Sequence, residues 1–125
     1  MFLLSNQLNE NVVNLYKKGN MGFFDFIFKL RKQKIESFLQ RGAMIIDVRS
    51  DEEFEDGHIP NSIHIPLQNL VEHIRDLKSN DKPIITCCAS GIRSSRAAKF
   101  LNLHNIEAIN GGGWKFLKKI IDRFD

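Results

Sequence analysis

The sequence predicts an α/β fold with a mostly parallel sheet flanked by helices. Four apolar runs of strand length recur between residues 43 and 110, and helical segments separate most of them. Because parallel strands need a long crossover connection, usually a helix, this alternation is typical of a parallel sheet within one domain. The length of 125 residues and the 42% of hydrophobic residues also fit one globular domain with its own core.

The chain opens with a segment that has no clear place in this fold. Residues 1–22 are rich in Asn and Lys and carry no sustained apolar pattern, so we expect a disordered leader before a domain over residues 23–125. Met21-Gly22-Phe23-Phe24 reads like the beginning of a chain, so residues 1–20 are also interpreted as an over-long start. The apolar stretch Phe23–Phe28 is expected to pack on the domain, because exposed aromatic side chains are unfavourable in water.

The remaining elements follow from periodicity and turn residues. Helical spacing predicts helices over Ile27–Leu39, Leu67–Leu77, Ser94–Leu103 and Trp114–Phe124. Short apolar runs predict strands over Ala43–Val48, Ser62–Ile65, Ile84–Cys87 and Glu107–Asn110. In the second of these helices we expect one apolar face, formed by Leu67, Leu70, Val71, Ile74 and Leu77.

A reactive cysteine is expected in the loop after the third strand. This loop reads Cys88-Ala89-Ser90-Gly91-Ile92-Arg93, and Ser94 opens the following helix. Ligands of parallel sheets bind at the carboxyl ends of the strands, and the first turn of a helix favours an anion. Small loop residues let backbone amides approach the sulfur, and Arg93 can hold an oxyanion at two points. The pattern therefore predicts a thiol with a lowered pKa.

The neighbouring Cys87 is expected to be structural. Successive side chains of a strand point to opposite faces of the sheet, so Cys87 should face the packed layer while Cys88 enters the loop. The two cysteines are the only ones in the chain, which excludes a disulfide scaffold and favours a reducing compartment, the cytoplasm.

Four ordered motifs resemble those of the rhodanese family. The loop Cys88–Ser94 is similar to its active-site loop, Asp47-Val48-Arg49 and Gly57-His58-Ile59-Pro60 resemble two upstream signatures, and Asn110–Gly113 resembles its late Gly-Gly turn. The resemblance implies a three-layer domain around a five-stranded, mostly parallel sheet. It also implies a sulfurtransferase in which Cys88 takes sulfane sulfur from a donor such as thiosulfate. The resulting persulfide passes its sulfur to cyanide or a protein thiol.

The resemblance also divides the site residues by role. It implies that Cys88 is catalytic and that the loop residues Ala89, Ser90, Gly91, Ile92, Arg93 and Ser94 bind the substrate. The signature residues Asp47, Arg49 and His58 are expected to hold the fold, the first two in a polar network at a strand end. No metal site is expected, because the four histidines are scattered, and no cofactor is expected beyond the persulfide sulfur.

Two other functions stay open from the sequence. Phosphatases and arsenate reductases use a similar strand, cysteine loop and arginine, but the phosphatases of this superfamily carry a loop one residue longer than Cys88–Arg93. No general acid for such a reaction is evident. A non-catalytic binding module is the other alternative, and the intact Cys88 and Arg93 count against it.

The charge distribution limits the expected partners. The net charge is +3, and the excess of Lys and Arg lies in residues 1–41, so the body of the chain offers no basic patch for nucleic acid. We expect a monomer that uses a small-molecule sulfur donor and a protein thiol as acceptor. Membrane contact through Phe23–Phe28 is not expected, and no apolar run is long enough to span a bilayer.

Overall fold

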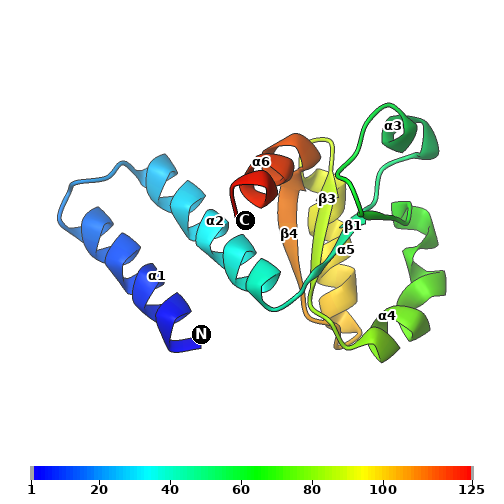
Figure 1. Cartoon of the computed structure of the whole chain (residues 1–125), viewed down its shortest axis with the longest axis horizontal. Helices are drawn as coiled ribbons and strands as arrows, with labels where there is room; N and C mark the ends of the chain where they lie inside the picture. The colour runs from blue at the N-terminus through cyan, green and yellow to red at the C-terminus, as the bar shows by residue number, and fades with distance from the viewer. Residues whose placement is uncertain (1, 125) are drawn as a thin grey trace.

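The computed structural model describes the backbone of residues 2–124 and the side chains of residues 10–124. It confirms the α/β fold (Figure 1). The sheet has the strand order β2-β1-β3-β4, and every pair is parallel. Its strands are β1 (Met44–Asp47), β2 (Ile63–His64), β3 (Ile84–Cys88) and β4 (Ala108–Gly113).

The sheet is four-stranded within residues 2–124, whereas the family resemblance implied five strands. Each of the four apolar runs recognised in the sequence forms one strand. The described residues before Met44 lie in two helices and their connecting turns, so that part of the chain supplies no fifth strand.

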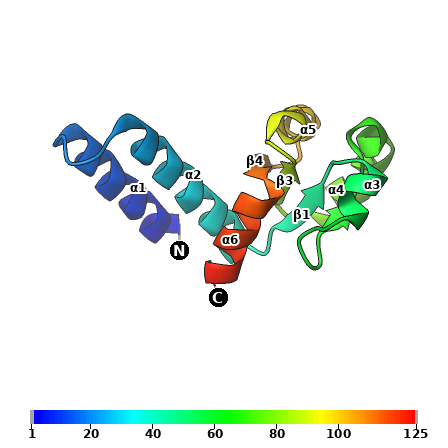
Figure 2. The same cartoon turned by 90° about the horizontal axis from the view of Figure 1, so that it is seen from above.

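Helices cover both faces of the sheet and give the expected three layers (Figure 2). On one face, α2 (Phe23–Gln40) and α6 (Trp114–Phe124) bury a cluster that contains Ile35, Phe38, Ile85, Leu117 and Ile120. On the other face, the 3₁₀ helix η1 (Leu67–His73), α4 (Ile74–Asn80) and α5 (Ile92–Leu103) bury a cluster that contains Ile46, Leu70, Leu77, Ile84 and Leu101. Each such side chain contributes about 1.5–3 kcal/mol through the apolar surface it removes from water.

The segment expected as one helix over Leu67–Leu77 is two shorter elements, η1 and α4. Val71, expected on the apolar face, is 60% exposed. A 3₁₀ helix has three residues per turn, so Leu67 and Leu70 lie above one another while Val71 rotates toward solvent. The expected apolar face is therefore wrong at this one position.

The short helix α3 (Asp51–Glu55) follows β1 and depends on its first residues. The hydroxyl of Ser50 accepts the N–H of Glu53, and the Glu53 carboxylate accepts the N–H of Ser50. This capping box satisfies two backbone donors. The three acidic residues of the first turn also stabilise the helix, because their negative charges lie at the positive end of the helix dipole. Glu53 is thereby fixed at the carboxyl-terminal end of the sheet.

Helix α1 (Phe2–Lys17) occupies most of the segment that the sequence predicted as a disordered leader. Figure 1 shows α1 and α2 as a hairpin beside the sheet domain. Val12 is buried, and the ring of Tyr16 stacks on Phe26 with 4.4 Å between centroids. Val12 and Tyr16 are four residues apart and share one helix face, a short pattern that the surrounding Asn residues obscure in the sequence.

The apolar stretch Phe23–Phe28 is only partly packed. Phe28 meets Phe116 of α6 at 4.9 Å between ring centroids, while Phe24 is 85% exposed. Within residues 2–124, none of the helices has the length and apolar character needed to cross a bilayer.

Candidate active site

Cys88 is the last residue of β3, and the loop that follows it leads directly into α5. The pairing of β3 with β4 shifts its register between Thr86 and Cys88, so the strand turns where the cysteine sits. The Thr86 hydroxyl donates to the carbonyl of Ser94 at 2.7 Å, which fixes the first turn of α5 against β3. The loop is therefore anchored at both of its ends.

The sulfur of Cys88 is surrounded by hydrogen-bond donors. Its Sγ accepts the N–H of Gly91 at 3.0 Å and the N–H of Ser94 at 3.4 Å. The Ser94 hydroxyl lies 3.3 Å from the same sulfur. Donors around a sulfur stabilise its anionic form, because each N–H dipole points its positive end at the charge.

The pKa of Cys88 reflects two opposed effects. The largest single effect is burial, which raises the pKa of the thiol because the residue is only 1% exposed. Hydrogen bonds from the Ser94 side chain and from the amides of Ser94, Gly91 and Ser90 lower it, and together they hold the pKa of Cys88 below its ordinary value. A lowered pKa leaves more nucleophilic thiolate at neutral pH.

The Ser94 hydroxyl lies between two acceptors. It donates to Asn110 Oδ1 at 2.6 Å and lies 3.3 Å from Cys88 Sγ. A hydroxyl has one proton, so it serves either the amide oxygen or a thiolate at any moment. While it serves Asn110, the S–H of a neutral Cys88 can donate to the Ser94 oxygen, which makes a chain of three groups.

Asn110 was not among the sequence-predicted site residues, although it opens the glycine motif. Its Nδ2 donates to the carbonyl of Gly91 at 3.0 Å, and its Oδ1 also accepts the N–H of Gly112 at 2.9 Å. These bonds fix which end of the amide faces the loop. Asn110 therefore joins β4 to the cysteine loop and orients Ser94.

The cysteine loop at Gly91 and the glycine end of β4 touch beside the sulfur. Gly91 has φ of +100°, and a Cβ there would lie 3.2 Å from the Cα of Gly112. A Cβ on Gly113 would lie 2.9 Å from the carbonyl oxygen of Ala89. The late glycine motif is thus a wall of the site, since larger residues would push the cysteine loop away.

Arg93 is held in an ion pair that sequence reasoning missed. Its Nη1 and Nη2 donate to the two carboxylate oxygens of Glu53 at 2.7 and 2.9 Å. This pairing with Arg93, followed by the hydrogen bond from the Ser50 backbone, lowers the pKa of Glu53 to about 2. The Ser-x-x-Glu spacing of Ser50 and Glu53 signals a capping box in the sequence, but nothing there indicates Arg93 as a partner.

The remaining loop residues differ in exposure. Ala89, Ser90 and Ile92 are exposed, whereas Gly91 and Ser94 are buried. The exposed residues form the outer side of the loop, and the buried ones face Cys88 Sγ through the hydrogen bonds described above. Of the predicted loop residues, Ser90, Gly91 and Ser94 are therefore the ones that contact the sulfur.

Asp47 and Arg49 form a buried network behind this loop. Arg49 donates through Nε and Nη2 to the Asp47 carboxylate at 2.8–3.0 Å, and Nη2 also donates to the carbonyl of Gly57 at 2.7 Å. The guanidinium lies 4.9 Å from the ring centre of Trp114, at the start of α6. The network joins the end of β1 to the loop after α3 and to the closing helix.

His58 lies apart from the cysteine loop. Its Nδ1 is 2.7 Å from the carbonyl of Phe54, and its ring stacks on Phe54 at 3.8 Å. His64 stacks on Phe54 as well, at 4.4 Å. Within residues 10–124, no group of three or more His, Cys, Asp or Glu side chains is placed to hold a metal ion.

The two adjacent cysteines belong to opposite faces of the sheet. Cys87 packs in the cluster under α2 and α6, and Cys88 in the cluster under α5. Burial raises the pKa of Cys87, and the nearby charge of Asp47 adds to this effect. The pKa values of the two thiols are therefore displaced in opposite directions, upward for Cys87 and downward for Cys88.

A parallel sheet that delivers an amide-lined cysteine to the start of a helix defines a class of α/β proteins whose chemistry depends on a thiolate. Within that class, the chain belongs to the rhodanese-like domain family, whose sequence profile matches residues 31–119. This match confirms the resemblance carried by the four motifs.

Relatives and solved structures agree with this assignment. Thiosulfate sulfurtransferase GlpE of Pseudomonas syringae pv. syringae is 29% identical over 87 residues, which cover 67% of this chain and 81% of that protein. A rhodanese-like domain protein from Staphylococcus aureus has 32% identity and a TM-score of 0.55, covering 61% of this chain and 74% of its own. The human single-domain sulfurtransferase TSTD1 has 27% identity and a TM-score of 0.54, and the match covers 69% of this chain and 90% of TSTD1. Two of these three proteins are named sulfurtransferases, and the third is named a rhodanese-like domain protein.

Proposed function

We propose that this protein transfers sulfane sulfur from thiosulfate to a thiophilic acceptor through a persulfide on Cys88. The observation that carries the proposal is the ring of donors from Gly91 and Ser94 around Cys88 Sγ. The donors point at Cys88 Sγ, so they would stabilise the thiolate that attacks the sulfur donor. They would stabilise the same thiolate again when it leaves as the acceptor takes the outer sulfur.

The loading step is a displacement at sulfur. The Cys88 thiolate attacks the outer sulfur of thiosulfate, a new S–S bond forms, and the bond to the sulfonate sulfur breaks. Sulfite leaves with the electron pair of that bond, so no oxidant or proton is needed. The total charge is unchanged, because the persulfide keeps the single negative charge of the thiolate.

The unloading step returns the cysteine to its first state. Cyanide carbon attacks the outer sulfur of the persulfide, thiocyanate leaves, and the S–S electron pair remains on Cys88 as a thiolate. A protein thiolate can attack the same atom and become a persulfide itself. The exposed loop residues Ala89, Ser90 and Ile92 are the surface that such an acceptor would meet first.

Arg93 would steady the departing sulfite. It stands one residue before Ser94, and its pKa is raised most by its hydrogen bond to Glu53 and further by the negative charge of Cys88. A guanidinium can hold two oxygens of a sulfonate group in the way it holds the two oxygens of a carboxylate. Thiosulfate would therefore compete with Glu53 for the same donors.

Intact-mass spectrometry after incubation with thiosulfate tests the proposal. The wild-type chain should gain one sulfur atom, and cyanide or dithiothreitol should remove it. Cys88→Ser should gain none, while Cys87→Ala serves as the matched control and should gain the same mass as wild type.

Two results would contradict sulfur transfer through Cys88. A wild-type chain that gains no mass, or a Cys88→Ser variant that gains the same mass, would exclude sulfur transfer through this residue. If the wild type instead released phosphate from an aryl phosphate in a Cys88-dependent manner, the loop would be a phosphatase site.

A further inference from the structure

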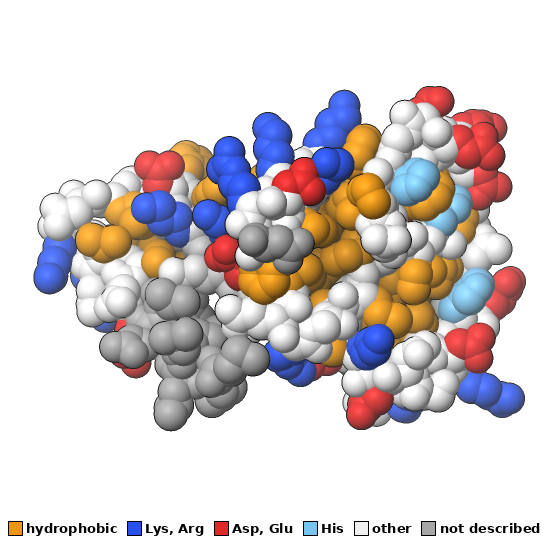
Figure 3. All heavy atoms as spheres, in the orientation of Figure 1, with side chains coloured by type: hydrophobic (Ala, Val, Ile, Leu, Met, Phe, Trp, Pro, Cys, Tyr) orange, Lys and Arg blue, Asp and Glu red, His pale blue; other side chains and the backbone are white. Residues whose placement is uncertain are grey.

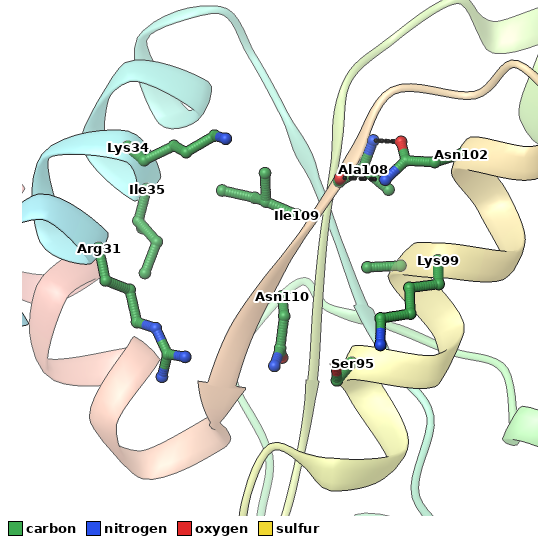
Figure 4. Close-up of a pocket in the computed structure, with 10 residues that line it drawn as sticks. Arg31, Lys34, Ile35, Ser95, Lys99, Asn102, Ala108, Ile109 and Asn110 are labelled. Atoms are coloured by element: carbon green, nitrogen blue, oxygen red, sulfur yellow. Dashed lines mark hydrogen bonds between the residues drawn. The ribbon is translucent and has the colours of Figure 1, made fainter. Parts of the chain in front are cut away.

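An open surface pocket lies between α2 and α5 and shares Asn110 with the cysteine site. Its volume is about 320 Å³, and it runs along β4, which is an edge strand of the sheet (Figure 4). Arg31 and Lys34 reach it from α2, and Lys99 reaches it from α5. Ile109 and Asn110 of β4 form its floor. Neither the cysteine chemistry nor the family motifs account for these three cations.

The cavity carries a positive charge that nothing in its lining balances. Its lining residues include three cations and no Asp or Glu. Within residues 10–124, none of Arg31, Lys34 and Lys99 forms an ion pair. Glu107 lies near enough for Lys34 to lower its pKa, but both of its carboxylate oxygens accept hydrogen bonds from Arg41.

A cavity at the other end of the sheet provides a comparison within the same molecule. It is lined by Arg41, Lys78 and Lys82, but also by Asp81 and Glu107. The number of cations is the same, and two carboxylates offset them. The pocket over β4 therefore differs from this one in having three cations and no carboxylate. Figure 3 shows the wider pattern, with Lys and Arg gathered over α2 and α6 and acidic side chains gathered around α3.

The open edge of β4 does not favour an added peptide strand at this place. Asn102 of α5 donates to the carbonyl of Ala108 at 3.0 Å and accepts the N–H of Ala108 at 2.9 Å. These two bonds occupy the backbone groups that an incoming strand would pair with. The cavity is thus suited to a small ligand rather than an extended segment.

We propose that this cavity binds a phosphate-bearing small molecule. Arg31, Lys34 and Lys99 would neutralise the phosphate oxygens, Arg31 as a two-point donor and the two lysines as point charges. Ile35 and Ile109 line the same cavity and offer apolar surface to an organic part of the ligand. The volume of about 320 Å³ exceeds what a single phosphate group fills.

Amide NMR with pyrophosphate as the probe tests the proposal directly, with chloride used to keep the ionic strength constant. Saturable shifts are expected at the backbone amides of Ser95, Asn102 and Asn110, which line the cavity. The double variant Lys34→Gln/Lys99→Gln should weaken binding about tenfold, because it removes two of the three charges. The matched control Lys78→Gln/Lys82→Gln removes two charges from the comparison cavity and should change binding less than about twofold.

A second arm distinguishes the sources of the phosphate. Adenosine monophosphate should bind more tightly than pyrophosphate if the ligand is an organic phosphate, and less tightly if it is inorganic. Either order supports a phosphate site. The proposal is overturned if the shifts grow linearly and spread over the cationic surface of α6, or if both double variants weaken binding equally. Binding of a long oligonucleotide with no binding of either small probe would also overturn it.

Discussion

Both terminal nitrogens of the Arg93 guanidinium donate to the carboxylate of Glu53, which is separated from Arg93 by 40 positions in the chain. The pair is about one-third exposed on each side. Glu53 uses two of the five guanidinium N–H groups, and an oxyanion that approaches Arg93 would also meet the negative charge of Glu53. The affinity for an anionic sulfur donor should depend on Glu53 as much as on Arg93.

We expect Glu53→Gln to lower the KM for thiosulfate a few-fold, because a neutral amide competes less strongly than a carboxylate for the guanidinium. Arg93→Ala should raise the KM about tenfold, and Arg93→Lys should recover only part of this loss, since Lys lacks the planar fork. In the Arg93→Ala background, Glu53→Gln should have no further effect. Steady-state kinetics of wild type, the two single variants Glu53→Gln and Arg93→Ala, and the double variant measure this coupling. An unchanged KM in Glu53→Gln would contradict the expected competition.

Acid should remove the contribution of Glu53 to stability. The folded-state pKa of about 2 lies below the ordinary value of 4.5, so the ion pair stabilises the fold above about pH 4.5 and loses this effect as the pH falls toward 2. The pair is partly exposed, so the effect should stay below about 1 kcal/mol. Thermal melts of wild type and Glu53→Gln should differ at pH 6 and converge near pH 2. A gap that persists unchanged at pH 2 would show that Glu53 acts through something other than its charge.

Ser94→Ala should raise the pKa of Cys88, because the substitution removes a donor that stabilises the thiolate. The thiolate fraction at neutral pH should then fall. The rate of iodoacetamide alkylation, followed as a function of pH, reports the midpoint directly. Ser95→Ala is the matched control, since Ser95 is the next residue of α5 and makes no described contact with the sulfur. Equal midpoints in all three proteins would remove the Ser94 hydroxyl from the site.

Cys87→Ala should keep sulfur loading and unloading at a modest stability cost. Cys87 is fully buried in the apolar cluster that contains Ile59 and Leu117, so deleting its sulfur leaves a small cavity worth about 1 kcal/mol. Cys87→Ser should cost more, because it places a hydroxyl in the same apolar surroundings. Denaturant titration gives the stability, and mass spectrometry follows the persulfide. Persulfide that forms but cannot be discharged in Cys87→Ala would assign a resolving role to this residue.

A chain that begins at Met21 should keep full sulfur loading on Cys88 and lose little stability. The contacts of the cysteine loop lie within β3, α5, β4 and α3, and the described packing of α1 is against α2. Rates of persulfide formation and melting temperatures of the two chains measure the difference. A large loss in either quantity would show that α1 belongs to the folding unit.

Much of the fold was predictable because its signals are local. The closing helix was predicted with the bounds that α6 has, since its apolar residues keep helical spacing after the glycine motif. The length of β4 was not predicted correctly, because three consecutive glycines normally indicate a turn. Here β4 continues through Gly113, and a Cβ on Gly111 would lie 2.7 Å from Ile85 and 2.8 Å from the carbonyl of Thr86. The close approach of two strands, which no single segment encodes, requires glycine at that position.

The site residues also fall into those that the sequence predicts and those that it does not. The loop Cys88–Ser94 was recognised because its residues are consecutive. Glu53 and Asn110 were missed because the sheet topology brings them to the loop from 40 and 16 positions away. Both are ordinary polar residues in their own segments, one in a helix cap and one before a glycine run. Their roles depend on which strand neighbours which, and only the three-dimensional arrangement gives that.

The placement of the two cysteines on opposite faces of β3 has a consequence for the fate of bound sulfur. A persulfide on Cys88 could not be resolved by the second thiol of the same chain without unpairing the strand. The loaded protein would therefore hold its sulfur until another molecule collects it. The lifetime of the persulfide would then depend on the concentration of acceptor molecules. The protein would store sulfane sulfur until an acceptor binds.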